Sequence, residues 1–412
     1  MTLIRTDEIT ATTIGGAGAA PSAGAGPRTV SAGALRARVL TGTAALAPVV
    51  PRWLELFARS DLGNANLHPA WMLAWYEVFV RDRDVVVVTV HAGDELVGVA
   101  PLWRMRLLPR FGRPAALQLA GAGRHVLLTD TPGVLTATGS HRKVVKAVAD
   151  ELATVPGWSW CTLTLSPRQG WSDQLAAPGV SCVVPRVGRA CVVSPLPATA
   201  DAFDAQLKRN VRESIRRSAN RLKRSGEAWS VERVPGSAPA FGGALDETVA
   251  LHGRRARLSA HKGHRDVFAD GRYARLLATA AAGPGGADLM TVYTLRVGGR
   301  ALAAQVVLHA PASSTLLVSG IHPDGWQYSP LALITREIAR DGIAAGRTRL
   351  DHSAGPDTGK LRWSEELETY PEFSVVRTDR RHRLAFLAHS HAAIGAGLRR
   401  ERRRAGPPGP GA

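Results

Sequence analysis

A strand–helix–strand pattern over residues 314–363 constrains the fold of this chain more than any other feature. An apolar, β-branched run at 315–318 predicts the first strand. Ser329 stands at a helix N-cap position, and Pro330 stands at the first helical position, where a missing N–H is tolerated. Apolar residues then recur at a helical period before the second strand, 347–351. Two strands joined by a helix predict a mixed α/β fold, with helices packed on a sheet.

The loop between the first strand and the helix predicts an anion site. Unpaired N–H groups and the positive end of the helix dipole would face it, which suits a phosphate-bearing donor. The candidate donor-binding residues are Gly320, Gln327, Ser329, Lys360 and Arg362. We expect Asp351 at the carboxyl end of the second strand, a usual place for site residues in α/β sheets. A crossover without any chemistry is the alternative interpretation of the same spacing.

Net charge narrows the choice of partners. The 412 residues contain 52 Lys and Arg against 34 Asp and Glu, which gives a formal net charge of +18. This surplus favours polyanionic partners: nucleic acid, a phosphorylated cofactor or an anionic membrane surface. Because Arg replaces Lys along most of the chain, drift in composition is the alternative explanation.

The two ends of the chain differ in composition from the part between them. Residues 1–33 are mostly Ala, Gly, Ser, Pro and Thr, and we expect disorder there because such a segment cannot bury enough apolar surface. Residues 399–412 are expected to be a second loose end. The remainder is long enough for two domains. No apolar run approaches the roughly 18 residues of a membrane span, which predicts a cytoplasmic protein with no integral span.

Two blocks of similar size follow the same plan. The first, 34–197, contains a strand, two helices, a hairpin over 85–100 and a strand–helix–strand unit, and it ends in an extended connector. The second, 198–378, contains a hairpin over 290–308 followed by the crossover described above. The repeated order of elements indicates a duplicated α/β unit. A basic helix and tail are expected over 379–412.

Local motifs occur along the chain in a recognisable order. They are His68-Pro69-Ala70-Trp71, the basic segment 208–224, Gly299-Arg300-Ala301-Leu302, and Tyr328-Ser329-Pro330-Leu331 followed by Gly346, Asp351, Gly355 and Lys360-Leu361-Arg362-Trp363. This set resembles the FemAB-like branch of the GNAT acyltransferase superfamily, particularly its CelD-like group of the cellulose-biosynthesis type. The resemblance implies two tandem GNAT-like domains, each a twisted mixed sheet flanked by helices, with catalysis in the second.

The resemblance also implies an activity: transfer of an acyl group, acetyl in the simplest case, to an amine of a small molecule or of an envelope or biosynthetic intermediate. Acyl-CoA would be the co-substrate, with no tightly bound cofactor and no DNA partner. Two positions differ from the family pattern. Gly359 replaces a Tyr before Lys360, and the glycine-rich loop of acetyl-CoA-binding relatives is missing before Pro330. The alternatives are an aminoacyl-tRNA donor, as in some FemAB-like enzymes, and a non-catalytic accessory protein of polysaccharide biosynthesis.

Three residues are candidates for the chemistry of amine attack. The reaction needs a route for the amine proton, which Asp351 or His352 could take directly or through water. Tyr328 could donate a proton to the departing thiolate or sugar oxygen. Lys360 and Arg362 could pair with a donor phosphate or a substrate carboxylate. Each residue also fits a structural role: a capping aspartate, an exposed histidine, a packed tyrosine and a solvated basic edge.

A predicted helix over 201–225 carries a second concentration of positive charge. The candidates for binding a polyanion, either a tRNA backbone or a coenzyme A phosphate, are Lys208, Arg209, Arg212 and Arg216. The alternative is an amphipathic helix whose long cationic side chains simply cover its flanks. The basic C-terminal region could contact a membrane surface, cover the site or dock on the second domain.

Other familiar sites are not indicated. The spacing of His252, His261 and His264 fits no standard zinc motif, and nearby cations would repel a metal ion, so no metal site is expected. The three cysteines lack paired spacing, which argues against a zinc site and a disulfide framework. The sequence also lacks a nucleophile elbow, a dinucleotide fingerprint and a P-loop.

Overall fold

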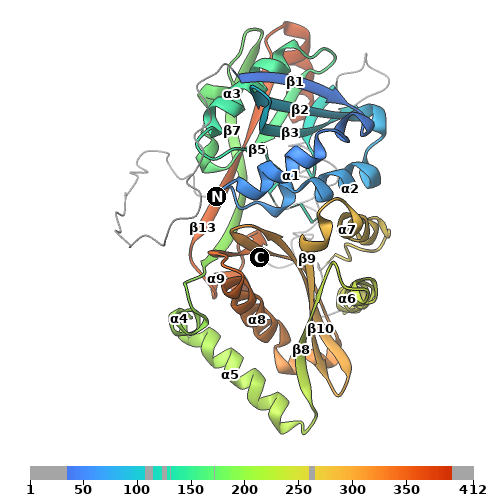
Figure 1. Ribbon diagram of the computed structural model, residues 1–412, viewed down its shortest axis with the longest axis vertical. Coiled ribbons are helices and arrows are strands. Elements are labelled where there is room, and N and C mark those ends of the chain that lie inside the picture. The colour runs from blue at the N-terminus through green and yellow to red at the C-terminus, as the bar shows by residue number, and fades with distance from the viewer. Residues whose placement is uncertain are drawn as a thin grey trace, which may run out of the picture.

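The computed structural model describes residues 35–106, 115–122, 128–129, 131–170, 172–258 and 265–391. Figure 1 shows an elongated molecule with two halves, one above the other, each built around strands with helices packed against them. The upper half comes from the first part of the chain and the lower half from the second. The predicted disordered segment 1–33 and most of the predicted basic tail lie outside the described residues.

The upper half begins with a strand and two helices. In chain order its elements are β1 (Leu35–Thr41), α1 (Val50–Arg59), α2 (Pro69–Phe79), β2 (Val85–Ala92), β3 (Glu95–Arg106), β4 (Ala115–Leu119), β5 (Leu135–Thr136), α3 (His141–Thr154), β6 (Trp160–Thr164) and β7 (Val180–Pro195). The predicted hairpin over 85–100 is β2–β3, with Gly93 at positive φ in its turn. At the start of α2, His68 Nδ1 accepts the N–H of Ala70 and Pro69 occupies the first turn.

The lower half repeats this order after two additional helices. Its elements are α4 (Ala200–Gln206), α5 (Arg209–Arg224), β8 (Trp229–Pro235), α6 (Phe241–Ala256), α7 (Arg272–Ala282), β9 (Met290–Val297), β10 (Arg300–Ala310), β11 (Ser313–Ile321), α8 (Pro330–Ala344), β12 (Arg349–Ala354), α9 (Thr358–Leu361) and β13 (Leu367–Arg377). The second predicted hairpin is β9–β10. Helical backbone over 380–391 then returns to the upper half, where Phe386 packs on Trp160 with ring centroids 5.6 Å apart.

The two halves are two copies of one plan. Each contains four antiparallel strands, β1–β4 or β8–β11, and then a parallel strand reached through a helix. The parallel pairs are β4–β6 across α3 and β11–β12 across α8. The mixed α/β fold expected from the sequence is therefore confirmed, and the repeated order of elements is a structural duplication.

The last strand of each copy crosses to the other copy. β13, from the end of the lower half, pairs with β6, whereas β7, from the end of the upper half, pairs with β12. β7 and β13 also pair with each other, so the strands form one 13-stranded sheet, and both are seen running along the molecule in Figure 1. Residues 185–197, expected as a connector, thus belong mostly to a central strand. Gly188 permits this pairing, because a Cβ there would lie 1.6 Å from the Tyr370 carbonyl oxygen.

The helix predicted over 201–225 is interrupted. α4 ends at Gln206 and α5 begins at Arg209, with Leu207 and Lys208 in extended conformations (ψ 139° and 145°). The break turns Lys208 toward the chain after α9, where its Nζ donates to the Leu361 carbonyl (3.0 Å) and pairs with Glu365 (2.6 Å). Tertiary contacts therefore override a continuous helical pattern.

Helices cover both faces of the lower sheet and also join the halves. Val211 of α5 and Ile334 of α8 belong to the apolar core on one face, and Leu251 of α6 belongs to the core on the other. That second core continues into the upper half. At the junction α2 packs against α7, with Phe79 and Tyr273 ring centroids 5.0 Å apart. A shared core makes the two halves one packed unit.

Candidate functional site

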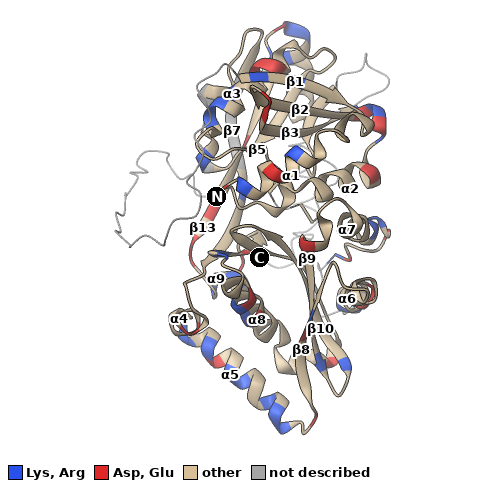
Figure 2. Cartoon of the chain, in the orientation of Figure 1, with Lys and Arg blue, Asp and Glu red and all other residues tan. Residues whose placement is uncertain are grey.

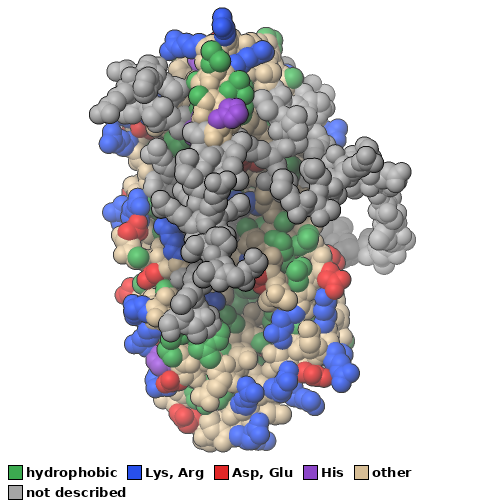
Figure 3. Space-filling model, turned by 180° about the vertical axis from the view of Figure 1, so that it is seen from behind, with side chains coloured by type: hydrophobic (Ala, Val, Ile, Leu, Met, Phe, Trp, Pro, Cys, Tyr) green, Lys and Arg blue, Asp and Glu red, His purple; other side chains and the backbone are tan. Residues whose placement is uncertain are grey.

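A cavity opens where β11 and β12 separate. Their parallel ladder ends at the Thr315–Asp351 pair, and within the described residues the two strands form no ladder pair beyond it. The space that follows has a volume of about 500 Å³ and is walled by β11, β12, α5, α6, α8 and the segment after β12. Figure 3 shows the rear of the molecule, where hydrophobic side chains gather around a hollow at mid-height and basic side chains lie below it. A split between two parallel strands thus creates this cleft.

The N-terminus of α8 forms one wall of this cavity through Ser329 and Pro330. Ser329 occupies the predicted N-cap position, but its backbone is left-handed (φ 47°, ψ 53°) and its side chain makes no capping hydrogen bond. A side chain of α5 holds the preceding turn, because Ser218 Oγ donates to the Tyr328 carbonyl. Strained backbone of this kind costs about 1–3 kcal/mol and concentrates at ligand sites. The helix terminus presents the positive end of its dipole to the cavity wall.

Ser353 is a second left-handed residue on the cavity wall (φ 67°). Lys360, a predicted donor-binding residue that also lines the cavity, fixes this bend. Its Nζ donates to Ser353 Oγ (2.9 Å) and to the carbonyls of Ser353 (3.3 Å) and Ala354 (2.7 Å). Asp357 in turn accepts the backbone N–H of Lys360 (3.0 Å). Lys360 therefore supplies positive charge to the cavity while holding the loop in shape.

His352 lines the cavity and is 3% exposed. Its Nε2 is hydrogen-bonded to Ser194 Oγ at 2.8 Å, and its ring lies 5.9 Å from that of Trp363. Burial, and to a smaller extent the charge of Lys360, lowers the pKa of His352 to about 3, so the imidazole is neutral near pH 7. Ser194 comes from β7, so the strand that crosses from the upper half orients this histidine.

Asp351 does not line the cavity. It lies within β12 rather than at the end of a strand, and its carboxylate accepts the N–H of Ser353 at 2.7 Å. Adjacent strand residues point to opposite faces, so His352 and Asp351 cannot both face the cleft. The expected position at a strand terminus was wrong because β12 continues to Ala354. The capping role that the sequence left open is the one its hydrogen bond fits.

Three more predicted residues lie beside the cavity rather than on its wall. Gly320 belongs to β11 at the place where α6 crosses it, and a Cβ there would lie 2.5 Å from the backbone nitrogen of His252. Gly320 therefore serves packing. The carbonyl of Gln327 accepts a hydrogen bond from Arg221, and its side chain donates to the Asp324 carbonyl (3.1 Å). Tyr328 is half-buried against the core beneath α5, as the alternative of a packed tyrosine anticipated.

Arg362 is the remaining predicted donor-binding residue, and it does line the cavity. Four polar side chains that were not predicted as site residues reach the same cavity from distant segments: Ser214 of α5, Arg255 of α6, Gln305 of β10 and Ser319 of β11. No motif in the sequence singled out any of these four side chains. Their distance from each other along the chain left no spacing signal from which they could have been found.

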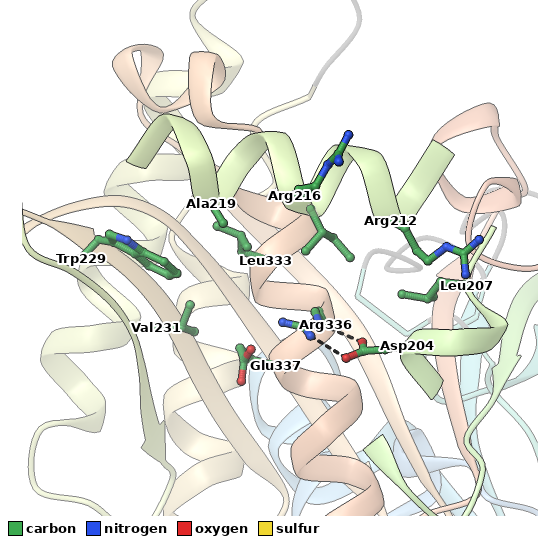
Figure 4. A pocket seen from close by; sticks show the side chains of 11 residues that line it. Asp204, Leu207, Arg212, Arg216, Ala219, Trp229, Val231, Leu333, Arg336 and Glu337 are labelled. Atoms are coloured by element: carbon green, nitrogen blue, oxygen red, sulfur yellow. Dashed lines mark hydrogen bonds and ion pairs between the residues drawn. The ribbon is translucent and has the colours of Figure 1, made fainter. Parts of the chain in front are cut away.

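The basic residues predicted to bind a polyanion lie on or next to α5, as Figure 2 shows. Lys208 and Arg209 are ion-paired with Glu365 (2.6 Å) and Glu213 (2.8 Å). Arg212 and Arg216 instead line a second hollow of about 480 Å³ between α5, β8 and α8, drawn in Figure 4. Its floor is apolar, and Asp204 closes one end by pairing with Arg336 (Nε–Oδ1 2.8 Å).

The predictions that the chain has no metal site and no membrane span can be compared with the structure only over the described residues. Among the described residues, no group of three His, Cys, Asp or Glu side chains is arranged to hold a metal ion. His261 and His264 lie outside those residues, whereas His252 is buried and hydrogen-bonded to the Ser319 carbonyl (2.8 Å). In the part of the chain that the structure describes, none of the helices combines the length and apolar character needed to cross a bilayer.

Comparison with protein families decides the class of enzyme. Residues 209–361 match the model of the acetyltransferase (GNAT) domain, and this range contains the β11–α8–β12 unit and its cavity. The protein is an acyltransferase.

Solved structures resemble the whole fold rather than the GNAT domain alone. A crystal structure of FemX superposes with a TM-score of 0.59 at 11% identity, covering 82% of this chain and 96% of that chain. The C-terminal domain of a candidate lysylphosphatidylglycerol synthetase from Agrobacterium fabrum gives 0.50 at 14% identity, with 84% and 96% covered. At such low identity the likeness is one of fold. No curated protein sequence matches the chain.

Proposed function

We propose that this GNAT domain transfers an acyl group, acetyl in the simplest case, from an acyl-CoA to the amine of a small molecule or biosynthetic intermediate. The single observation that carries the proposal is the separation of β11 from β12 beside the N-terminus of α8. The strands leave backbone groups unpaired next to an open cavity, and a thioester arm has both length and amide groups to lie there. Cytoplasm, where acyl-CoA is made, is the compartment we propose.

The donor is expected to bind with its phosphates toward the positively charged wall. The N-terminus of α8 offers a dipole, and Lys360 and Arg362 add two cations on the cavity lining. Ser329 belongs to the same wall. Arg362 also borders a further hollow, of about 610 Å³, with Lys208 and Arg217, which extends the positive surface toward α5. The three predicted donor-binding residues that line the cavity therefore keep this role in the proposal.

The chemistry requires an amine that attacks as the neutral base. Its nitrogen bonds to the thioester carbon, the oxyanion of the tetrahedral intermediate collapses, the C–S bond breaks, and the thiolate leaves and is protonated. When His352 Nε2–H donates to Ser194, Nδ1 is an acceptor with no partner among the described residues. We assign the amine N–H to this acceptor. Because the pKa of His352 is depressed, its imidazole orients the amine and passes the amine proton on to water instead of remaining protonated.

The FemAB-like alternative replaces the thioester with an aminoacyl-tRNA ester. The observation in its favour is α5, on which Arg212 and Arg216 form no ion pairs among the described residues and line the hollow beneath the helix. A tRNA backbone could follow such a surface, with strong dependence on salt. The CelD-like assignment within this branch, and contact of the basic C-terminal helix with an anionic membrane surface, are parts of the proposal that rest on sequence alone.

Ligand-dependent unfolding separates the donors. A ligand bound only by the folded protein adds about 2.7 kcal/mol to the free energy of unfolding at 100 times its Kd, a clear rise in Tm. We expect acetyl-CoA or a longer acyl-CoA to raise Tm, and free coenzyme A to do so less. A rise with aminoacyl-tRNA alone, abolished by RNase, would replace acyl-CoA by the tRNA donor. No rise with any of these ligands would refute both donors.

A further inference from the structure

Arg255 is a half-buried cation that faces the cavity without an acidic partner. It lies in the last turn of α6, where its Nη1 donates to Ser319 Oγ (3.3 Å) and its guanidinium carbon lies 5.6 Å from the ring centroid of Trp326. No Asp or Glu forms an ion pair with it among the residues that the structure describes. Burial lowers the pKa of Arg255, which is the sign of a charge removed from water without a counter-charge.

Some other arginines of the lower half that lie partly out of water are paired with acids. Arg296 pairs with Glu232 of β8 (2.6 Å) and with Glu247 of α6 (2.8 Å). A cation that is partly withdrawn from water is destabilised unless an anion meets it. Arg255 is in this situation on the wall of the cavity between β11 and β12, so a ligand is the natural source of the missing anion.

The position of Arg255 is built into the packing of α6 on β11. The helix approaches so closely at Gly320 that a Cβ there would lie 2.6 Å from Leu251 Cβ. His252 Nδ1 is hydrogen-bonded to the Ser319 carbonyl at 2.8 Å. One turn further on, Arg255 is carried over Ser319 and against Trp326. The helix therefore holds the guanidinium at one end of the cavity.

We propose that Arg255 binds an anionic group, a carboxylate or a phosphate, carried by the amine that accepts the acyl group. This inference rests on the proposed function. α6 and α8 lie on opposite faces of the lower sheet (Figure 1), so Arg255 reaches the cavity from the face opposite to the one that α8 covers and packs there on Trp326. A planar guanidinium binds either anion through paired N–H groups.

Gln305 supports the same assignment on the amine side. Its Nε2 donates to the carbonyls of Val306 (2.9 Å) and Val318 (3.1 Å), which leaves Oε1 as an acceptor on the cavity lining. A substrate that carries both an amine and an anion would therefore donate its amine N–H to Gln305 Oε1 and pair its anion with the Arg255 guanidinium. These two groups come from different elements, β10 and α6. The acceptor class is a small amino acid or an amino phosphate ester.

The experiment compares Arg255→Ala with Arg254→Ala, since Arg254 is the exposed neighbour on the same helix and does not line the cavity. Acyl transfer from acetyl-CoA is measured with matched amines: β-alanine against propylamine, and phosphoethanolamine against ethanolamine. The wild type should prefer the anionic member of a pair. Arg255→Ala should raise KM for that member at least about tenfold, with little change for the neutral amine, and Arg255→Lys should recover part of the loss. Arg254→Ala should match the wild type.

Direct binding of β-alanine and phosphoethanolamine, measured by calorimetry on the same variants, keeps the two proposals distinguishable. Loss of binding in Arg255→Ala alone supports the anion site even if no amine is acylated, an outcome that would count against the proposed function only. The carboxylate and phosphate arms identify which anion is bound. Equal KM for charged and neutral amines, binding that survives in Arg255→Ala, or no binding of either anion to the wild type would each overturn the inference.

Discussion

The upper and lower halves contain the same split between parallel strands, but the upper one is filled and the lower one is open. In the upper half the β4–β6 ladder ends at Gln118–Thr162, the counterpart of the Thr315–Asp351 pair that ends the β11–β12 ladder. Among the described residues, a cavity beside the end of β6, lined by Thr164, Ser166 and Gln169, measures only about 10 Å³, against about 500 Å³ for the cavity beyond the lower ladder. The backbone plan alone therefore does not make a site.

Side chains decide which copy stays open. In the upper half Gln118 Nε2 bonds Thr162 Oγ1 (3.2 Å), and Gln169 Nε2 reaches the Val134 carbonyl (2.6 Å). Leu163, three positions after the first residue of the β4–β6 ladder, corresponds in register to His352 of β12. An apolar residue is buried in one copy, and a polar ring faces a cavity in the other. Duplication thus provides one packed copy and one open copy, and we propose that the reaction takes place in the open one.

The largest effect is expected from making the lower copy resemble the upper one. His352→Leu removes the acceptor that we assign to the attacking amine, and we expect kcat/KM to fall about 100-fold or more. The fold should persist, because leucine already occupies the corresponding position at Leu163. Steady-state acyl transfer and thermal unfolding of the same samples test this. Full activity in His352→Leu would show that His352 takes no part in acyl transfer.

The reverse comparison concerns stability. Leu163 is completely buried, and Leu163→Ala should lower the free energy of unfolding by about 2–5 kcal/mol through lost burial and the cavity left behind. Activity per folded molecule should change little, because this residue lies in the scaffold half. Denaturant unfolding and active-fraction measurements provide the two readouts. A specific activity that falls while stability is unchanged would contradict the division of roles.

A smaller effect is expected where α6 crosses β11. Gly320→Ala places a Cβ 2.5 Å from the His252 backbone nitrogen and should cost about 1–3 kcal/mol of stability. The matched control is Gly242→Ala in the same helix, where a Cβ meets no atom within 4 Å and should stabilise by up to about 1 kcal/mol. Denaturant unfolding of both variants is the measurement. Equal stability of the two would show that the close approach of α6 is not required.

The last prediction concerns pH and compares one buried histidine from each half. Burial lowers the pKa of His68 in the upper half to about 4 and that of His309 in the lower half to about 3, from 6.5. The unfolded chain takes up these protons as the pH falls below 6.5, whereas the folded protein does not. The free energy of unfolding should therefore fall by about 1.4 kcal/mol per pH unit for each histidine between roughly pH 5.5 and 4.

Denaturant unfolding at several pH values, with His68→Gln and His309→Gln, tests that prediction. Each variant should take up about one proton fewer on unfolding, so the free energy of unfolding should depend less steeply on pH. The two substitutions should have similar effects. A slope that neither substitution changes would mean that these buried rings do not control the acid sensitivity of the protein.

Local patterns in the sequence predicted most elements, because each depends on neighbouring residues. The hairpins β2–β3 and β9–β10 follow from apolar runs around glycine turns. α8 follows from Pro330 and the apolar period after it. The motifs within 209–361 also indicated the enzyme class that the family match then supported. These features need no knowledge of where distant segments lie.

Predictions that depended on distant contacts fared less well. The alternation of β12 turns His352 toward the cavity and Asp351 away from it, and this could not be seen while residue 351 was expected to end the strand. Gly320 looked like a ligand-binding glycine, yet it accommodates α6. No local spacing connects Arg255 to the site.

The sequence by itself determined the duplicated order of strands and helices, because hydrophobic period, turn residues and helix caps act over a few positions. Tertiary structure decided that β7 and β13 exchange between the halves, that Ser194 of one half orients His352 of the other, and that one strand split is filled while its copy is open. Those outcomes depend on side chains brought together from segments more than a hundred residues apart, and packing selects among such pairings only when the whole sheet forms.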